Sequence, residues 1–517
     1  MTGRHRAEPA DDTRAHTERR RDALSLIGDA VAASGGGVYL GAGSSGPAWA
    51  GKEQAVLVLG PPRSGKTSSI VIPTVVGASG AVVSTSTKPD VMHATVAARA
   101  ERGPCLLYDP SETVDPPDGV RRVRWSPVTS CRRWDDALLV ARSLLGAARP
   151  AIAPLGHAPG ADHWSERAEA LLATTLHAAA LDGEGLAAVL SWVDRRQAAP
   201  ALDILDSRGA AIAGDLLAGI AATEAREQSG IWSTASGVLA AYRSASALAT
   251  TVAPDFDPDA FCDCAATLYI CATGRHQAVA APLVVGLLTD IRAAAYGRAA
   301  RSSAASAGPT TALPVVLALD EVANIAPVPD LPGMVSEGGG QGVLTLACLQ
   351  DLSQARSRWG QAAEGFLSLF GTTVVLPGIG DVRTLQALSA LAGEEEVAIR
   401  SVSTPAPSRG GVGAVMSRLV LGGRRPEAPA TVTTGSVLRR RLPVDVLARG
   451  QPGMAVVVDE RNQMGWVRLT PWFATEPWRS AALGDDLARA LGAPLTRQVG
   501  RPSPVETRGG RGLERGF

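Results

Sequence analysis

Gly60-Pro-Pro-Arg-Ser-Gly-Lys-Thr67 fits the pattern of a phosphate-binding loop, G-x-x-x-x-G-K-[ST]. The apolar run Ala55–Leu59 comes directly before it and predicts a buried strand. In such a strand-loop-helix unit, backbone N–H groups surround the phosphates, and the helix presents its positive N-terminus to them. The sequence therefore predicts a binding site for a nucleoside triphosphate.

Two side chains of this loop carry specific chemistry. We expect Lys66 to reach the β- and γ-phosphates and the Thr67 hydroxyl to bind Mg²⁺, so ATP and Mg²⁺ are the predicted ligands. The predicted nucleotide-binding residues are Gly60, Pro61, Pro62, Arg63, Ser64, Gly65, Lys66, Thr67 and Ser68.

An acidic pair supplies the second half of the predicted site. Val315–Leu319 reads as a buried strand, and Asp320 and Glu321 follow at its carboxyl end, where parallel sheets bind ligands. We expect Asp320 to hold Mg²⁺ through water and Glu321 to polarise the attacking water. A further strand, Val343–Leu349, ends at Gln350, which we expect to sense the γ-phosphate.

Composition limits the other possibilities. The chain has 517 residues, no net formal charge and 45% hydrophobic residues, so any binding of nucleic acid must come from a local basic patch. No stretch reaches the ~18 uninterrupted apolar residues of a membrane-spanning helix. Cys262 and Cys264 have no His or Cys cluster nearby, so we expect reduced thiols and no structural metal.

The order of apolar segments predicts an α/β fold. Short apolar strands alternate with helices on both sides of a central segment that has helical periodicity and no strand, so we expect a mostly parallel sheet with an all-α inserted domain. Residues 401–436, rich in Pro, Gly, Ser, Thr and Arg, are expected to form a long flexible loop. The predicted divisions are a flexible segment (1–52), the sheet domain in two parts (53–131 and 256–475), the all-α insertion (132–255) and a disordered Arg/Gly-rich tail (476–517).

With these elements in place, the chain resembles the type IV secretion coupling proteins, the TraG/TraD class of conjugative DNA-transfer ATPases, over roughly residues 54–475. The most specific stretch is Leu319-Asp-Glu-Val-Ala-Asn324, which continues through Pro329-Asp-Leu-Pro332 to Leu349-Gln-Asp-Leu-Ser-Gln354. Other matching segments are Val71-Ile-Pro-Thr74, Ser86-Thr-Lys-Pro-Asp90, Tyr108-Asp-Pro110, Trp125-Ser-Pro-Val128 and His163-Trp-Ser-Glu-Arg-Ala168.

The resemblance implies a RecA-like P-loop NTPase core that carries the all-α domain, with six subunits in a ring around DNA. It implies that ATP hydrolysis moves single-stranded DNA, bound to its relaxase, into a membrane-embedded secretion channel. It assigns motor roles to Lys66, Thr67, Asp320, Glu321 and Gln350. The expected location is the cytoplasm, extending to the inner face of the cell membrane.

The sequence departs from the family pattern in two places. Family members usually carry membrane-spanning helices before the motor, and none is predicted here. Many also carry an arginine, acting on a neighbouring subunit's ATP, in the turn that is Glu337-Gly-Gly-Gly-Gln341 in this chain. The candidates to replace it are Arg275, Arg356, Arg358 and Arg383, and the sequence does not choose among them.

Two alternatives therefore stay open. One is a receptor that recruits substrates with little ATPase activity, and the other is an FtsK- or HerA-like motor that moves double-stranded DNA. Whether the chain is a coupling protein or an FtsK- or HerA-like motor, three basic clusters are candidates for contacts with DNA phosphates. They are Arg121-Arg122 with Arg124, Arg424-Arg425, and Arg439-Arg-Arg441.

Overall fold

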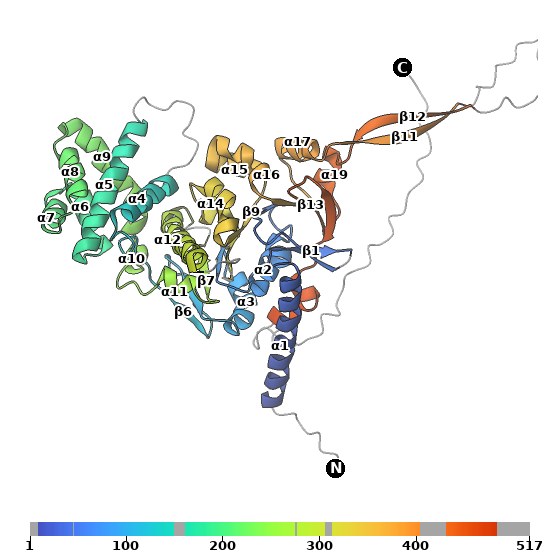
Figure 1. Cartoon of the computed structure of the whole chain (residues 1–517), viewed down its shortest axis with the longest axis horizontal. Helices are drawn as coiled ribbons and strands as arrows, with labels where there is room; N and C mark the ends of the chain where they lie inside the picture. Colours follow the sequence, from blue (N-terminus) through green and yellow to red (C-terminus); the bar gives the residue numbers. More distant parts are fainter. Residues whose placement is uncertain are drawn as a thin grey trace, which may run out of the picture.

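The computed structural model describes residues 9–44, 46–148, 161–273, 277–305, 313–403 and 431–482. A twelve-stranded sheet runs through the molecule in the order β2-β1-β14-β13-β10-β3-β9-β8-β4-β7-β5-β6. Figure 1 shows the helical insertion on one side of this sheet and a two-stranded ribbon projecting from the opposite side.

Eight consecutive strands, from β10 to the edge strand β6, are parallel, as the alternation of strands and helices predicts. Side chains of one strand alternate between two apolar cores: Leu57 and Leu59 belong to one, and Val56 and Val58 to the other. Because both faces are covered, these strands read as continuous apolar runs. The strands are β3 (Val56–Leu59), β4 (Val82–Ser86), β5 (Cys105–Tyr108), β6 (Val120–Arg122), β7 (Thr267–Cys271), β8 (Val315–Leu319), β9 (Val343–Leu349) and β10 (Thr372–Val375).

Helices cover the two faces of the sheet (Figure 1). The phosphate loop leads into a π-helical turn, η1 (Thr67–Val71), which continues as α2 (Ile72–Gly77). The other helices of the sheet domain are α3 (Asp90–Ala100), α12 (Gln277–Ala305), α13 (Val322–Ile325), α14 (Leu331–Gly338), α15 (Leu352–Trp359), α16 (Phe366–Leu369), α17 (Val382–Leu391) and α19 (Val444–Arg449). The predicted α/β class is therefore observed.

The central segment is helical throughout its described residues. Helix α4 packs against both α5 and α12, so it joins the insertion to the sheet domain. The helices are α4 (Trp134–Ala148), α5 (Ala161–Asp182), α6 (Leu186–Asp194), α7 (Ala199–Ser207), α8 (Ala211–Ala221), α9 (Ala225–Val238), α10 (Ala245–Ala249) and α11 (Pro258–Cys262).

The prediction of a flexible N-terminal segment is wrong for its described part. Helix α1 (Pro9–Ala33) buries Ala23, Ile27 and Val31, which recur every four residues and so share one face. Strands β1 (Tyr39–Gly43) and β2 (Gly46–Trp49) then join the sheet, because Ala42 pairs with Arg468 of β14. The Gly-rich sequence conceals these strands, since β1 is joined to the sheet by a partner more than 400 residues away in the chain and β2 pairs only with β1.

Two other predicted flexible segments contain regular structure. Helix α20 (Trp478–Ala482) begins the expected tail, and Trp478 is buried against Tyr39, with ring centroids 4.9 Å apart. The expected loop 401–436 begins and ends in strands β11 (Glu394–Ser403) and β12 (Thr431–Arg440), which pair with each other. Residues 404–430 and 483–517, with Arg424, Arg425 and most of the predicted tail, lie outside the described residues.

Strands β13 (Met454–Val458) and β14 (Met464–Arg468) form an antiparallel hairpin near the end of the sheet domain. All six cysteines are free thiols, in agreement with the expectation. Within the described residues, no group of His, Cys, Asp and Glu is arranged to hold a metal by protein ligands alone.

Candidate active site

Three neighbouring strands bring the predicted site residues to one edge of the sheet. Strand β9 lies between β3 and β8, so Gln350 follows the strand that separates the phosphate loop from Asp320. The loop is tied to this edge by the Gly60 N–H, which donates to the Leu349 carbonyl oxygen at 3.1 Å. The parallel register thus assembles residues that are about 250 to 290 positions apart in the sequence.

The loop backbone requires its glycines. Gly65 has φ of +96°, in the region that glycine adopts at least cost, and Arg63 has φ of +62°. A Cβ on Gly60 would lie 2.8 Å from Cβ of Leu376, so only glycine fits where the loop leaves β3. Successive turns of this kind point backbone N–H groups into one concave surface, which is the shape that binds phosphate.

Lys66 and Thr67 occupy the end of this loop. The Lys66 ammonium donates to the carbonyl oxygens of Gly60 and Pro61, the latter at 3.0 Å, and so lies across the loop mouth. The Thr67 hydroxyl donates to Oδ2 of Asp320 at 2.6 Å. The two halves of the predicted metal site are therefore in direct contact.

The Asp320 carboxyl is buried, with 6% of the residue exposed. Burial raises its pKa above the usual value, and the Thr67 hydrogen bond and the Lys66 charge oppose part of that rise. Its own carbonyl oxygen accepts a 3.0 Å hydrogen bond from the Thr85 hydroxyl at the end of β4. Thr85 therefore fixes the strand end that presents the carboxylate, a role that no feature of the sequence indicates.

Glu321 has the left-handed conformation, with φ of +53° and ψ of +47°, which is uncommon for a residue with a side chain. Its carboxylate accepts a 3.0 Å hydrogen bond from Nδ2 of Asn324. Strain of this kind is concentrated at functional sites. Asn324 was part of the motif quoted above, and its spacing of three residues from Glu321 was the available signal for this contact.

The site contains the kinds of ligand that Mg²⁺ and a nucleotide require. Mg²⁺ prefers oxygen ligands and commonly takes one or two from protein, with phosphates and water completing the set. The Thr67 hydroxyl and the Asp320 carboxylate supply such oxygens side by side. Ser64 Oγ is buried and finds no hydrogen-bond partner among the described residues, so the loop also holds an unused polar group. The residues fit the predicted ligands.

Gln350 is exposed at the end of β9, and its backbone N–H donates to Oε1 of Gln354 at 3.0 Å. Its side chain is therefore free to approach a ligand at this edge. The proposed sensing role stays a prediction.

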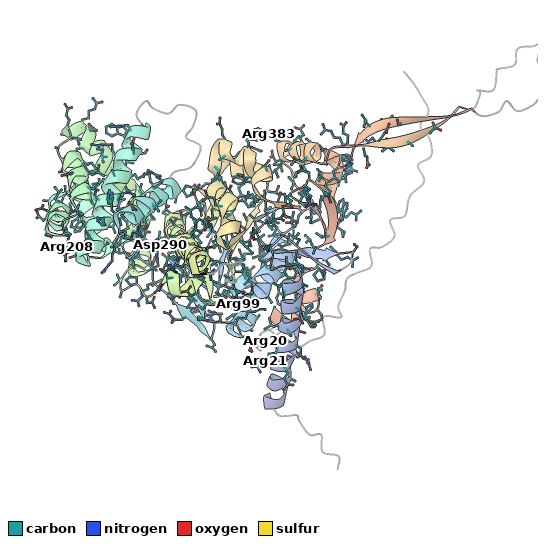
Figure 2. All side chains as sticks on the ribbon, viewed as in Figure 1. Arg20, Arg21, Arg99, Arg208, Asp290 and Arg383 are labelled. Carbon is teal, nitrogen blue, oxygen red and sulfur yellow. The ribbon has the colours of Figure 1, made fainter. Side chains whose placement is uncertain are left out.

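The described candidate arginines have different surroundings. Arg356 forms a 2.6 Å ion pair with Asp381 and is largely buried, and Arg358 donates to the Ala147 carbonyl oxygen at 2.9 Å. Arg383, labelled in Figure 2, is 69% exposed and pairs with Glu364 at the surface. Arg275 lies outside the described residues. An arginine that acts on another subunit must be exposed, and Arg383 meets that condition best.

Of the basic clusters, the one before Trp125 is occupied within the chain. Arg121 pairs with Asp255, and Arg122 donates to the Val114 carbonyl oxygen at 2.7 Å. Arg124 donates to the Val252 carbonyl oxygen at 3.3 Å. Arg121 and Arg124 thus fasten the segment leading into the insertion to the segment leaving it.

The protein-family model described as "Type IV secretory system Conjugative DNA transfer" matches residues 13–414, more than three quarters of the chain. The chain belongs to this family. The resemblance predicted from the loop, the acidic pair and the motifs around them is thereby confirmed.

This member of the conjugative DNA transfer family also resembles solved structures of the bacterial conjugative coupling protein TrwB. The unbound form of TrwBdeltaN70 has a TM-score of 0.57 at 18% identity, covering 81% of this chain and 85% of that chain. TrwB with the non-hydrolysable GTP analogue GDPNP has a TM-score of 0.57 at 18% identity, covering 81% and 86%. TrwB with ADP and Mg²⁺ has the same TM-score and identity, covering 83% and 88%.

At this identity the likeness shows the fold, and it confirms the predicted RecA-like α/β architecture. No curated protein sequence matches the chain. None of the described helices combines the length and apolar character needed to cross a membrane.

Proposed function

We propose that this family member is an ATP-hydrolysing coupling protein that recruits single-stranded DNA, or a relaxase–DNA complex, and moves it into a type IV secretion channel. The proposal rests on one observation above all: Thr67 of the phosphate loop lies 2.6 Å from Asp320, with Glu321 directly after it. This arrangement supports Thr67 and Asp320 as the metal-binding pair and Glu321 as the candidate base. TrwB structures with ADP and Mg²⁺ and with ATP and GTP analogues support ATP and Mg²⁺ as the ligands.

The chain's own residues divide the chemical work. Lys66 exchanges its two backbone carbonyl partners for the β- and γ-phosphates, and the loop N–H groups hold the remaining phosphate oxygens. When bound, Mg²⁺ supplies positive charge that neutralises the phosphate oxygens during transfer. Glu321, oriented by Asn324, accepts a hydrogen bond from the attacking water and aligns it.

Loss of the γ-phosphate must be converted into movement. Gln350 stands between the loop and Asp320, so it can contact the γ-phosphate and transmit its departure along β9 and α15. In a ring of six identical subunits, Arg383 would reach the ATP of the next subunit and stabilise charge in the transition state. The partners are single-stranded DNA, a relaxase and the membrane-embedded channel proteins, at the inner face of the cell membrane.

A receptor that recruits substrates with little hydrolysis is the second candidate. The turn Glu337–Gln341 has no basic side chain, and Arg356 and Arg358 have partners within the chain. Under that reading, binding of the substrate persists without turnover.

ATP hydrolysis by the full chain, with and without single-stranded DNA, distinguishes the two. We expect DNA-stimulated turnover that Lys66→Ala and Glu321→Gln each reduce by about 10²- to 10⁴-fold. Glu321→Gln should still bind ATP, because the phosphate loop is intact. Arg383→Ala should also lose turnover, whereas Lys52→Ala, a change at an exposed lysine outside the loop, should not. Nucleotide binding without turnover in the native protein would favour the receptor.

A further inference from the structure

A two-stranded ribbon projects from the sheet domain. Strands β11 and β12 contain ten residues each and pair antiparallel in one uninterrupted register, from Glu394↔Arg440 to Ser403↔Thr431. They form a separate sheet and extend well clear of the other elements (Figure 1). At about 3.3 Å per residue the ribbon is roughly 33 Å long.

Among the described residues, no further strand pairs with either edge of this ribbon. An isolated two-stranded hairpin is only marginally stable in water, and each edge carries unpaired N–H and C=O groups that can add another strand. Val437 is 46% exposed and Leu438 is 67% exposed, so apolar surface is also uncovered. These features indicate that a partner completes the ribbon.

The charges on the two strands differ in sign. Strand β11 begins with three exposed glutamates, Glu394, Glu395 and Glu396, and β12 ends with the exposed arginines Arg439 and Arg440. They stand at one level, because Glu394 pairs with Arg440 and Glu395 with Arg439. Edges of one sign would repel strand addition, whereas an acidic edge and a basic edge complement each other.

We propose that β11 of one subunit pairs edge to edge with β12 of a second copy of this chain. Parallel pairing of β11 with β11 would place glutamates opposite glutamates, and antiparallel pairing would place them opposite the uncharged far end of the strand. Only β12 brings arginines opposite the glutamates, so we expect the contact to join unlike edges. Unlike edges give a head-to-tail interface, which closes into a ring when the rotation allows. The number of copies in the ring rests on the proposed function. The contact between the two edges does not depend on that function.

When copies are related by rotation about an axis parallel to the ribbon, neighbouring strands of adjacent copies stay antiparallel. Within one ribbon β11 and β12 run in opposite directions, so β12 of one copy also runs opposite to β11 of the next. Glutamate and arginine then alternate around the assembly at the level of Glu395 and Arg439. The pairing gives hydrogen-bond partners to the unpaired N–H and C=O groups of both edges. It also brings β11 of the neighbouring copy beside Leu438.

The root of the ribbon allows a clean experiment. The Arg441 N–H donates to the Gly393 carbonyl oxygen at 3.1 Å, so the two ends are adjacent and the ribbon can be excised there. Just outside it, the Ser389 hydroxyl donates to the Leu442 carbonyl oxygen at 2.6 Å and anchors the root to α17. Joining Gly393 to Arg441 therefore leaves the sheet domain unaltered.

Disulfide trapping between two single-cysteine variants tests the contact. In a background with the exposed thiol removed by Cys264→Ser, the variants Glu395→Cys and Arg439→Cys are prepared separately, mixed and oxidised. The two cysteines are on different chains, so a bond between them cannot form within one hairpin. We expect covalent dimer in the mixture and little with either variant alone. A mixture that gives no more dimer than the single variants overturns the proposal, as does dimer from Glu395→Cys alone.

Charge reversal provides an independent readout. One variant changes Glu394, Glu395 and Glu396 to Arg, and another changes Arg439 and Arg440 to Glu. We expect each alone to lose assembly, measured by mass in solution, and an equimolar mixture to regain it, because acidic ribbons then alternate with basic ribbons. Damage within each hairpin could not be repaired by mixing, so regained assembly attributes the loss to the contact between copies. Assembly that survives either reversal alone overturns the proposal.

A variant that lacks the ribbon, with Gly393 joined to Arg441, distinguishes the role of the ribbon from that of the ATP site. We expect it to lose assembly while still binding ATP through the intact phosphate loop. If excision instead weakens binding of single-stranded DNA and leaves assembly unchanged, the arginines serve the nucleic acid and the proposal fails. Absence of ATP hydrolysis in the native chain would count against the proposed function alone, since the trapped dimer requires no turnover.

Discussion

Two buried aspartates occupy opposite kinds of surroundings in this protein. Asp320 and Asp290 are each 6% exposed, and burial raises the pKa of both carboxyls. Asp320 ends a strand beside the phosphate loop, where Thr67 donates to it and Lys66 is near. Asp290 lies inside helix α12 at the base of the insertion (Figure 2), where Trp125 and Ser130 donate to it.

The difference teaches that burial alone does not identify a catalytic carboxylate. Asp290 accepts from the Trp125 indole and so fastens α12 to the segment leading into the insertion. The backbone N–H of Trp125 donates separately to the Thr250 carbonyl oxygen at 2.9 Å. This cluster of Trp125, Ser130, Thr250 and Asp290 is called the junction below. Asp320 instead adjoins a strained glutamate and a loop suited to phosphate, so its hydrogen bond can be exchanged for a ligand.

Replacing each aspartate by asparagine should separate the two roles most strongly. We expect Asp320→Asn to reduce ATP turnover by about 10³- to 10⁴-fold, because a metal ion contributes several kcal/mol to the transition state and this change weakens its anchor. Asp290→Asn should leave turnover within about twofold, since the junction contacts no residue of the site. Steady-state hydrolysis with DNA present measures both.

The matched substitution is the control, because both changes remove one charge and keep a side chain of similar size. Circular dichroism should show both variants folded. Equal loss of turnover in the two variants would mean that the junction takes part in the hydrolytic cycle, and the distinction drawn here would fail.

The pH dependence of stability should single out Asp290. Burial raises its pKa from 3.8 to about 7, so the folded protein keeps this proton to a higher pH than the unfolded chain does. The contribution to stability is fully present below about pH 4 and is lost as pH rises to about 7. The loss is on the order of 4 kcal/mol, since each pKa unit corresponds to about 1.4 kcal/mol.

Asp290→Asn removes this titration and keeps an oxygen that can accept from Trp125. The free energy of unfolding of the native chain minus that of the variant should therefore fall between pH 4 and pH 7. Taking this difference cancels the titration of distant groups, which both proteins share. A difference that stays constant across the range would show that Asp290 is not the titrating group.

The sequence predicted the parts of the molecule that are contiguous. Strands β3, β8 and β9 are apolar runs buried on both faces, and the phosphate loop is a single motif, so each could be recognised locally. Their meeting at one edge followed from the rule that parallel strands bind ligands at their carboxyl ends. The contact of Thr67 with Asp320 was therefore foreseeable.

The elements that the sequence concealed depend on distant partners. Strand β1 is interrupted by glycines and is fixed by β14, while Trp478 is ordered by packing on Tyr39 and Trp49. The ion pair of Arg356 with Asp381 likewise exists only because α15 and α17 lie together. Local patterns contain no information on such pairings, and this is why the candidate arginines could not be ranked before the fold was known.

The smallest expected effect concerns how tightly the junction is packed. A Cβ added to Gly286 of α12 would lie 2.6 Å from Cη2 of Trp125, which is 1% exposed and cannot move away freely. Overpacking of this kind costs about 1–3 kcal/mol, and the higher helix propensity of alanine returns up to about 1 kcal/mol. We expect Gly286→Ala to lower the free energy of unfolding by about 1 kcal/mol without changing turnover.

Gly219→Ala is the matched control, because Gly219 also lies within a helix, α8, and a Cβ there would meet no heavy atom within 4 Å. It should raise the free energy of unfolding by about 0.5–1 kcal/mol through helix propensity alone. Chemical denaturation of both variants measures the contrast. If Gly286→Ala stabilises the protein as much as Gly219→Ala does, Trp125 has room to shift, and the junction is a looser and more mobile contact than its buried hydrogen bonds indicate.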